Sequence, residues 1–153
     1  MTGETNLGAL ATEAVRSDGL DLGATSTPLL LRMMADDMAD IQAALRGASA
    51  ATALAIDRIV ELLRARGRLI YLGAGTSGRL ALMDAAECVP TFAADPGQVV
   101  ALIAGGAEAA GSAVEGAEDN PLEAQRRLAE LKLSPLDAVV GLSAKRPEVP
   151  APR

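Results

Sequence analysis

The chain of 153 residues contains no histidine, no tryptophan and only one cysteine, Cys88. The absence of histidine excludes Ser–His and Cys–His catalytic pairs and every metal site that depends on imidazole. A single cysteine can form neither an internal disulfide nor a thiolate zinc site. Any catalysis must therefore use carboxylates, hydroxyls, arginine, lysine, backbone amides or a bound cofactor.

Aromatic side chains, basic charge and long apolar runs are also scarce. Tyr71 and Phe92 are the only aromatic residues although half of the chain is apolar, which predicts a closely packed aliphatic core. The net charge is −6, whereas proteins that bind nucleic-acid duplexes are typically basic. We therefore expect no nucleic-acid partner. We expect no membrane segment and no secretion signal, and therefore a soluble, cytoplasmic protein of one domain at most.

The first 67 residues predict an arm followed by helices. Residues 1–25 are Gly-rich without sustained periodicity, which is typical of an extended arm. Residues 26–67 predict a helical hairpin. Its first helix begins at Thr27-Pro28 and ends at Gly47, with a second helix over about 50–66 and Gly67 just beyond its end. One apolar face of the first helix is formed by Leu30, Met34, Met38, Ile41 and Leu45.

Residues 68–144 predict strands that alternate with helices. Apolar runs at 68–72, 99–103 and 138–142 are typical of buried strands, and helices are expected over about 78–87 and from Asn120-Pro121 onward. Pro90 is expected to prevent the first of these helices from continuing. This alternation favours an α/β fold with a parallel sheet of about three strands, thin for its class. Residues 145–153 hold three prolines and predict a tail.

A glycine-rich loop follows the first predicted strand. Gly73, Gly75 and Gly78 match G-x-G-x-x-G, but the expected acid, Asp95, precedes the next strand instead of ending it, which argues against dinucleotide binding. A phosphate-binding P-loop requires Lys followed by Ser or Thr, and here Arg79-Leu80 stands at these two positions. The motif is therefore not a P-loop. What remains is an anion site of backbone amides, the hydroxyls of Thr76 and Ser77, and a helix N-terminus. A phosphorylated small metabolite suits it, and the structural alternative is a tight strand-to-helix turn.

Two carboxylates are candidates for acid–base chemistry. Glu87 stands at the predicted C-terminal end of the helix that begins at the loop, where the helix dipole would raise its pKa. Glu118 lies in an acidic loop near the same edge of the sheet, and two carboxylates in different environments can divide the roles of acid and base. The structural alternatives are an exposed helix-end glutamate and a solvated loop. Cys88 is most simply a small buried apolar residue.

Four segments in register carry a resemblance to a known family. They are RLIYLGAGTSGRLALMDAAECVPTF (68–92), VVALIAGG (99–106), GAEDN (116–120) and DAVVGLSA (137–144). They resemble the N-terminal half of the N-acetylmuramic acid 6-phosphate etherases, in the sugar isomerase (SIS) domain superfamily. The resemblance runs from about Thr12 to Ala144. It implies an SIS-type three-layer α/β/α fold, with residues 68–144 as a partial SIS domain.

The resemblance also implies a reaction and its residues. The family removes the C2 proton of the opened amino sugar 6-phosphate, eliminates the D-lactyl ether at C3 and adds water, without a metal or an organic cofactor. Glu87 maps to the acid–base at C2 and Glu118 to a second catalytic carboxylate. Gly75, Thr76 and Ser77 map to the loop that binds the sugar phosphate. SIS sites are commonly completed across a dimer interface, so a homodimer is expected.

Two departures from the family pattern affect these expectations. The Asn-Pro of the family's N-terminal arm, which helps to shape the sugar site in the family, is missing after Thr12-Glu13. After Ala144 the family continues with a Ser-Gly-Arg-Thr-Pro segment and about as much chain again, whereas here Lys145-Arg146-Pro147 follows, as in a truncated or frameshifted gene. The alternative to an active or inactive etherase is a non-catalytic, regulatory SIS module that binds a sugar phosphate. Nicotinamide nucleotide binding is not expected.

Overall fold

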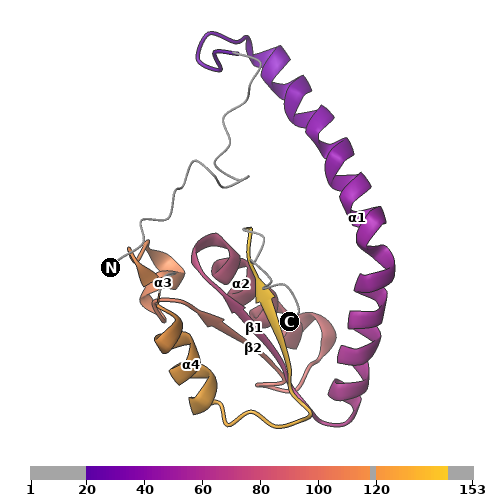
Figure 1. Cartoon of the computed structure of the whole chain (residues 1–153), viewed down its shortest axis with the longest axis vertical. Coiled ribbons are helices and arrows are strands. Elements are labelled where there is room, and N and C mark those ends of the chain that lie inside the picture. Colours follow the sequence, from indigo (N-terminus) through magenta and orange to yellow (C-terminus); the bar gives the residue numbers. More distant parts are fainter. Residues whose placement is uncertain (1–19, 118–119, 145–153) are drawn as a thin grey trace, which may run out of the picture. The chain divides into compact units, whose positions relative to one another are not determined.

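The computed structural model describes residues 20–117 and 120–144 of the chain (Figure 1). Residues 1–56 and 57–153 form two compact units, and each is described by itself. The predicted tail and most of the predicted arm lie outside the described residues, as does Glu118.

The predicted helical hairpin is wrong, because one continuous helix, α1 (Thr27–Arg64), passes through Gly47. A glycine inside a helix costs only about 1 kcal/mol relative to alanine, and the surrounding sequence is rich in alanine, the strongest helix former. No neighbouring atom lies within 4 Å of where a Cβ of Gly47 would be, so nothing packs there to impose a turn. The glycine was therefore a weak stop signal in a favourable helical context.

The C-terminal end of α1 closes with a left-handed residue, and that residue is Arg66. The Gly67 amide donates to the Leu62 carbonyl at 2.9 Å and the Arg66 amide to the Leu63 carbonyl at 3.1 Å, the two bonds of a Schellman motif. Gly67 is required for a different reason than the sequence suggested. A Cβ at this position would overlap the carbonyl oxygen of Leu136, so the two backbone segments are in direct contact.

Three parallel strands form the sheet, as the sequence predicted. They are β1 (Leu69–Gly73), β2 (Val99–Ile103) and β3 (Ala138–Leu142), in the order β2-β1-β3. The central strand places Leu72 opposite Leu102 on one side and Gly141 on the other. Ile70, in this central strand, is fully buried. The apolar core is aliphatic and consists of Leu62, Leu69, Ile70, Ala81, Leu102, Ile103 and Ala109.

Helices connect the strands: α2 (Gly75–Phe92) joins β1 to β2, while α3 (Glu108–Gly111) and α4 (Pro121–Glu130) precede β3 (Figure 1). Parallel strands in the order 2-1-3, joined by right-handed crossovers, place α2 and α4 on opposite faces of the sheet. The contacts agree, since Gly78 of α2 packs on Ile103, whereas Ala124 of α4 lines a pocket with Leu72 and Leu102. This is the predicted α/β/α arrangement.

The expected stop of α2 at Pro90 is wrong, because the helix continues to Phe92. Proline removes one backbone hydrogen bond, and so close to the end of a helix that loss is small. The helix ends at Ala93, which is left-handed with φ of 52° and donates its amide to the Cys88 carbonyl. The predicted start of α4 is confirmed, because the Asn120 side chain accepts a hydrogen bond from the Glu123 amide at 3.1 Å.

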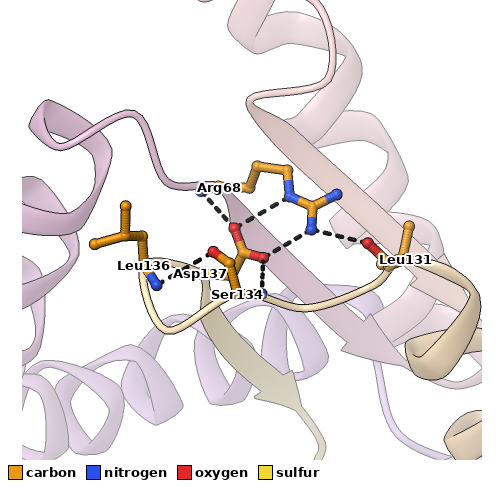
Figure 2. A network of polar contacts seen from close by, with 5 residues as sticks. All are labelled: Arg68, Leu131, Ser134, Leu136 and Asp137. Carbon is orange, nitrogen blue, oxygen red and sulfur yellow. Dashed lines mark hydrogen bonds and ion pairs between the residues drawn. The ribbon is translucent and has the colours of Figure 1, made fainter.

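An ion pair holds β3 beside β1 at the N-terminal end of the sheet (Figure 2). The Arg68 guanidinium donates to Oδ2 of Asp137 at 2.7 Å from one nitrogen and to Oδ1 at 3.1 Å from Nε. The Arg68 backbone amide also donates to Oδ1 at 3.0 Å, and the Ser134 amide donates to Oδ2 at 2.8 Å. The carboxylate of Asp137 thus receives four hydrogen bonds while its side chain is only 3% exposed.

The same residues connect the loop before β3 to the sheet. The Arg68 guanidinium donates to the Leu131 carbonyl at 2.9 Å, and the Leu136 amide donates to Oγ of Ser134 at 3.2 Å. The Arg68 guanidinium and the Ser134 amide hold the pKa of Asp137 well below its usual range, and the Asp137 carboxylate raises the pKa of Arg68. The pairing register of β3 is therefore fixed by a charged, multiply bonded contact at the residue that directly precedes the strand.

We predict that Asp137→Asn lowers the melting temperature by several degrees at neutral pH, because it removes the charge while the donors remain. In the folded chain the pKa of Asp137 is depressed, so its stabilisation is present above the unfolded value of about 3.9 and is lost as the pH falls below it. The gap between wild type and variant should therefore narrow below about pH 4.

Thermal melts followed by circular dichroism from pH 3 to 7 check this prediction. Asp95→Asn is the matched control, because it removes the exposed Arg66–Asp95 pair, whose side chains are 86% and 72% exposed. Such pairs contribute little to stability. Equal losses in the two variants, or a gap that does not change with pH, would contradict the role assigned to Asp137.

Candidate anion site at the carboxyl edge of the sheet

The candidate site begins at the turn from β1 into α2. Ala74 is the N-cap of α2 and has an extended backbone. Because alanine has no polar side chain, no side-chain oxygen caps the first turn of the helix. Gly75 opens the helix with φ of +52°, a left-handed value that favours glycine. The first-turn amides of Gly75, Thr76 and Ser77 have no acceptor within the helix, so they can donate to a bound anion.

The outer glycines of the G-x-G-x-x-G motif serve packing. A Cβ on Gly73 would lie 2.8 Å from the Gly78 amide nitrogen, and one on Gly78 would lie 2.5 Å from Cγ1 of Ile103. The end of β1 and the first turn of α2 are therefore in backbone contact. A Cβ on Gly75 would meet no atom within 4 Å, so this glycine faces open space. The motif thus combines a tight strand-to-helix turn with an accessible helix N-terminus.

Two pockets of about 400 Å³ each open at the carboxyl edge of the sheet. The first includes Gly73 and Ala74 at the end of β1 and Leu142 and Ser143 at the end of β3, which is the switch point of a sheet with this strand order. The second includes Gly75 and Thr76. Ala104 and Ala117 line both pockets, so the two are neighbours. Ligands of open α/β sheets bind at this edge.

The structure brings together only part of the predicted site. Gly75 and Thr76 line the second pocket. Ser77 lines neither pocket, but it lies in the first turn of α2 beside them in the sequence. Glu118 lies outside the described residues; the residues around it, Ala117 and Asn120, line the first pocket.

Glu87 does not lie in either pocket. It stands twelve residues after Gly75 in α2, a rise of roughly 18 Å at 1.5 Å per residue. That separation exceeds the length of a monosaccharide phosphate. The predicted position at the end of the helix is also wrong, because α2 continues for five residues beyond Glu87. Glu87 is exposed, and the helical period places it on the same face as the exposed Leu80 and Met83.

Two arginines at the pockets were not singled out as functional in the sequence. Arg79 lines the second pocket, and its guanidinium donates to the carbonyls of Ala109 at 3.0 Å and Ser112 at 2.7 Å, which fastens α3 to α2. Arg127 lines the first pocket and is half-buried, with one guanidinium nitrogen beside the backbone of Gly106. Among the described residues Arg127 makes no hydrogen bond or ion pair. Its place could not be read from the sequence, because it depends on how α4 crosses the sheet.

Tyr71, Asp84 and Cys88 lie together where α2 covers the sheet. Burial and the Asp84 carboxylate raise the pKa of Tyr71 to about 12. Burial and the same carboxylate raise the pKa of the Cys88 thiol. A protonated thiol is a poor nucleophile. Cys88 is only half-buried, so the expectation of a small buried apolar residue is met in part.

Within residues 20–117 and 120–144, no helix combines the length and the apolarity needed to cross a membrane. In the same part of the chain, no three side chains of cysteine, aspartate or glutamate gather into a group that could hold a metal ion.

The fold and the edge site define an SIS-type α/β domain. Residues 51–145 match the family model described as the glucokinase regulatory protein N-terminal SIS domain, and the chain belongs to this family. Its similar curated relatives are named N-acetylmuramic acid 6-phosphate etherase. The resemblance stated from the sequence is thereby confirmed.

Three of these relatives give the extent of the similarity. The protein of Rubrobacter xylanophilus is 46% identical over 141 residues, 92% of this chain and 47% of the relative. That of Gloeobacter violaceus is 47% identical over 135 residues, 88% of this chain and 44% of the relative. That of Mycolicibacterium smegmatis is 46% identical over 139 residues, 91% of this chain and 47% of the relative. The chain thus spans about half the length of the relatives it matches.

We predict that Gly78→Ala destabilises the site by about 1–3 kcal/mol, because its Cβ would push on Ile103 and on the Gly73 carbonyl. Gly111→Ala is the matched control, since a Cβ there meets no atom within 4 Å. Urea unfolding followed by circular dichroism measures both variants. Equal stability of the two would show that the turn tolerates a side chain and is not tightly packed.

Proposed function

We propose that this chain carries the N-terminal half of an N-acetylmuramic acid 6-phosphate etherase site and acts in amino sugar catabolism and cell-wall recycling in the cytoplasm. The observation that carries the proposal is the open first turn of α2 beside two pockets, in a chain about 46% identical to proteins of that name. The proposed enzyme class is a carbon–oxygen lyase.

The proposed reaction proceeds on the opened sugar. A carboxylate removes the proton on C2, the C3–O bond breaks, and D-lactate leaves after it receives a proton. Water then adds across the resulting double bond and gives N-acetylglucosamine 6-phosphate. Two carboxylates in different environments suffice for these proton transfers, and we assign them to Glu87 and Glu118. No step requires a metal or an organic cofactor.

The phosphate is proposed to bind at the first turn of α2. Three amides and the hydroxyls of Thr76 and Ser77 can donate to its oxygens, and the dipole of an 18-residue helix favours negative charge there. The substrate also carries the lactyl carboxylate. Arg127, half-buried in the neighbouring pocket without a partner among the described residues, is the proposed contact of this second anionic group.

Glu87 is proposed to act in the site of a second copy. It lies too far along α2 to reach a sugar whose phosphate is bound at Gly75 of the same chain. Its neighbours on the helix face, Leu80 and Met83, are 55% and 64% exposed, and an apolar surface of this kind favours contact with another chain. A homodimer would thus bring the phosphate loop of one copy to the carboxylate of its partner.

A second candidate is a non-catalytic sugar-phosphate-binding module. The match to the SIS domain of a regulatory protein favours it, as does the separation of Glu87 from the pockets of one chain. Such a module would bind the sugar phosphate at the same loop and release no D-lactate. The two candidates are separated by the assay below.

We predict that the purified chain releases D-lactate from N-acetylmuramic acid 6-phosphate, and that Glu87→Gln and Glu118→Gln each lower kcat by about 10²–10⁴-fold while substrate binding is retained. Glu108→Gln, at another exposed helical position, is the control and should leave the rate unchanged. Retention of the wild-type rate in Glu87→Gln would contradict the assignment of Glu87.

Mixing two inactive variants tests the shared site. Gly75→Asp places a negative charge where the phosphate is proposed to bind, at a left-handed position that aspartate tolerates. Random exchange between Gly75→Asp and Glu87→Gln chains should restore about a quarter of the wild-type rate, because half of the dimers then hold one intact site of two. No recovery would mean that each chain uses its own Glu87. Binding of the substrate without any lactate would favour the regulatory module.

A further inference from the structure

Residues 107–117, called the wall segment below, form one side of the second pocket. Ala109 and residues 113–117 line this pocket together with Gly75, Thr76 and Arg79 of α2. The segment has the sequence AEAAGSAVEGA, in which Val114 is the only apolar side chain larger than alanine. A segment of such small side chains can bury little apolar surface, so burial alone holds it weakly against the rest of the domain.

The backbone hydrogen bonds of the wall segment are local. The Ser112 amide donates to the Glu108 carbonyl at 3.2 Å, and the Ala117 amide donates to the Val114 carbonyl at 3.4 Å. The helix of the segment, α3, has only four residues and is too short to be stable alone. Small side chains of the segment also pack on Gly105, but among the described residues only one side chain outside the segment donates hydrogen bonds to it.

That side chain is Arg79. Its Nε donates to the Ala109 carbonyl at 3.0 Å, and a second guanidinium nitrogen donates to the Ser112 carbonyl at 2.7 Å. The two carbonyls lie in α3 and directly after it, where a short helix leaves its carbonyls without amide donors. Hydrogen bonds from a charged donor are about twice as strong as neutral ones. One planar group therefore clamps the C-terminal end of α3.

The same arginine belongs to the helix that carries the phosphate loop. Arg79 follows Gly75 by four residues, which places both on one face of α2, about 6 Å apart along the axis. The preceding residue, Gly78, is buried against Ile103, so the backbone that carries Arg79 is closely packed. Arg79 forms no ion pair among the described residues. Its guanidinium thus links the loop to the wall segment without a carboxylate partner.

We propose that Arg79 is the positioning residue of the phosphate pocket, because its guanidinium holds the wall segment beside the first turn of α2. The pocket is then formed before the ligand arrives, and binding does not have to order the segment. The proposal rests on the proposed function for the identity of the ligand. Arg79 differs in role from Arg127, since it acts through the wall segment and not on the lactyl carboxylate.

Amide hydrogen exchange of the full chain, followed by nuclear magnetic resonance, tests the hold without any ligand. In Arg79→Gln, the amides of Ala110 and Ser112 should exchange about tenfold faster, while that of Leu102, buried in β2, keeps its rate. Arg79→Lys should behave like Arg79→Gln, because an ammonium group lacks the planar fork that reaches both carbonyls. The matched control is Arg126→Gln, which alters an arginine of α4 that is 65% exposed and should change none of these rates.

Binding of N-acetylglucosamine 6-phosphate, measured by calorimetry, tests the consequence for the pocket. Arg79→Gln and Arg79→Lys should each raise Kd about tenfold, and Arg126→Gln should leave it unchanged. Because coupling is reciprocal, a saturating concentration of the sugar phosphate should also slow exchange at Ser112 in the unaltered chain. A contact that only stabilises the fold would not give this response.

The possible failures are distinguishable. Unchanged exchange at Ala110 and Ser112 in Arg79→Gln would overturn the proposal. Full affinity in Arg79→Lys would also overturn it, because positive charge alone would then suffice. If the unaltered chain binds no sugar phosphate, the proposed function fails, and the exchange rates alone decide whether Arg79 holds the wall segment.

Discussion

The backbone contact between the end of β1 and the first turn of α2 is the constraint on which the site depends. Gly73 and Gly78 are in contact without side chains between them, and Gly78 also touches Ile103 of β2. This contact aims the first turn of α2 at the carboxyl edge of the sheet, where the pockets open. Any side chain at these two glycines would tilt the helix away and carry its amides with it. The site is therefore a consequence of close packing as much as of polar chemistry.

The opposite end of the sheet is held by charge. Arg68 and Asp137 pair directly before β1 and β3, and the carboxylate receives four hydrogen bonds. This contact fixes the register of β3 at one end, so that Leu142 and Ser143 arrive beside Gly73 and Ala74 at the other end. The binding edge thus owes its shape to a contact made at the far end of the same strands.

Most of the α/β fold could be predicted from local patterns. Continuous apolar runs predicted all three strands, because the strands of a covered parallel sheet are apolar on both faces. Asn120-Pro121 predicted the start of α4, because the helix cap is a local hydrogen bond. The failures were at Gly47 and Pro90, where stop signals were outweighed by strong helix formers and by nearness to a helix end. The loop of Gly75 and Thr76 was predictable from its glycines. The position of Arg127 required the crossing of α4 over the sheet, which no local pattern contains. The distance of Glu87 from the loop follows from a separation of twelve residues along one helix, and only the true extent of α2 had to come from the structure.

In the proposed enzyme, the phosphate site of one chain lies beside the Glu87 carboxylate of a second copy. The central claim of this account is that the first turn of α2 binds the sugar phosphate. The most direct measurement is a nuclear magnetic resonance titration of the ¹⁵N-labelled chain with N-acetylglucosamine 6-phosphate and with N-acetylmuramic acid 6-phosphate. The account predicts that the amides of Gly75, Thr76 and Ser77 shift with both sugars, while the side-chain Nε–H of Arg127 shifts only with the lactyl-bearing one. Shifts elsewhere with these three amides unchanged would contradict it.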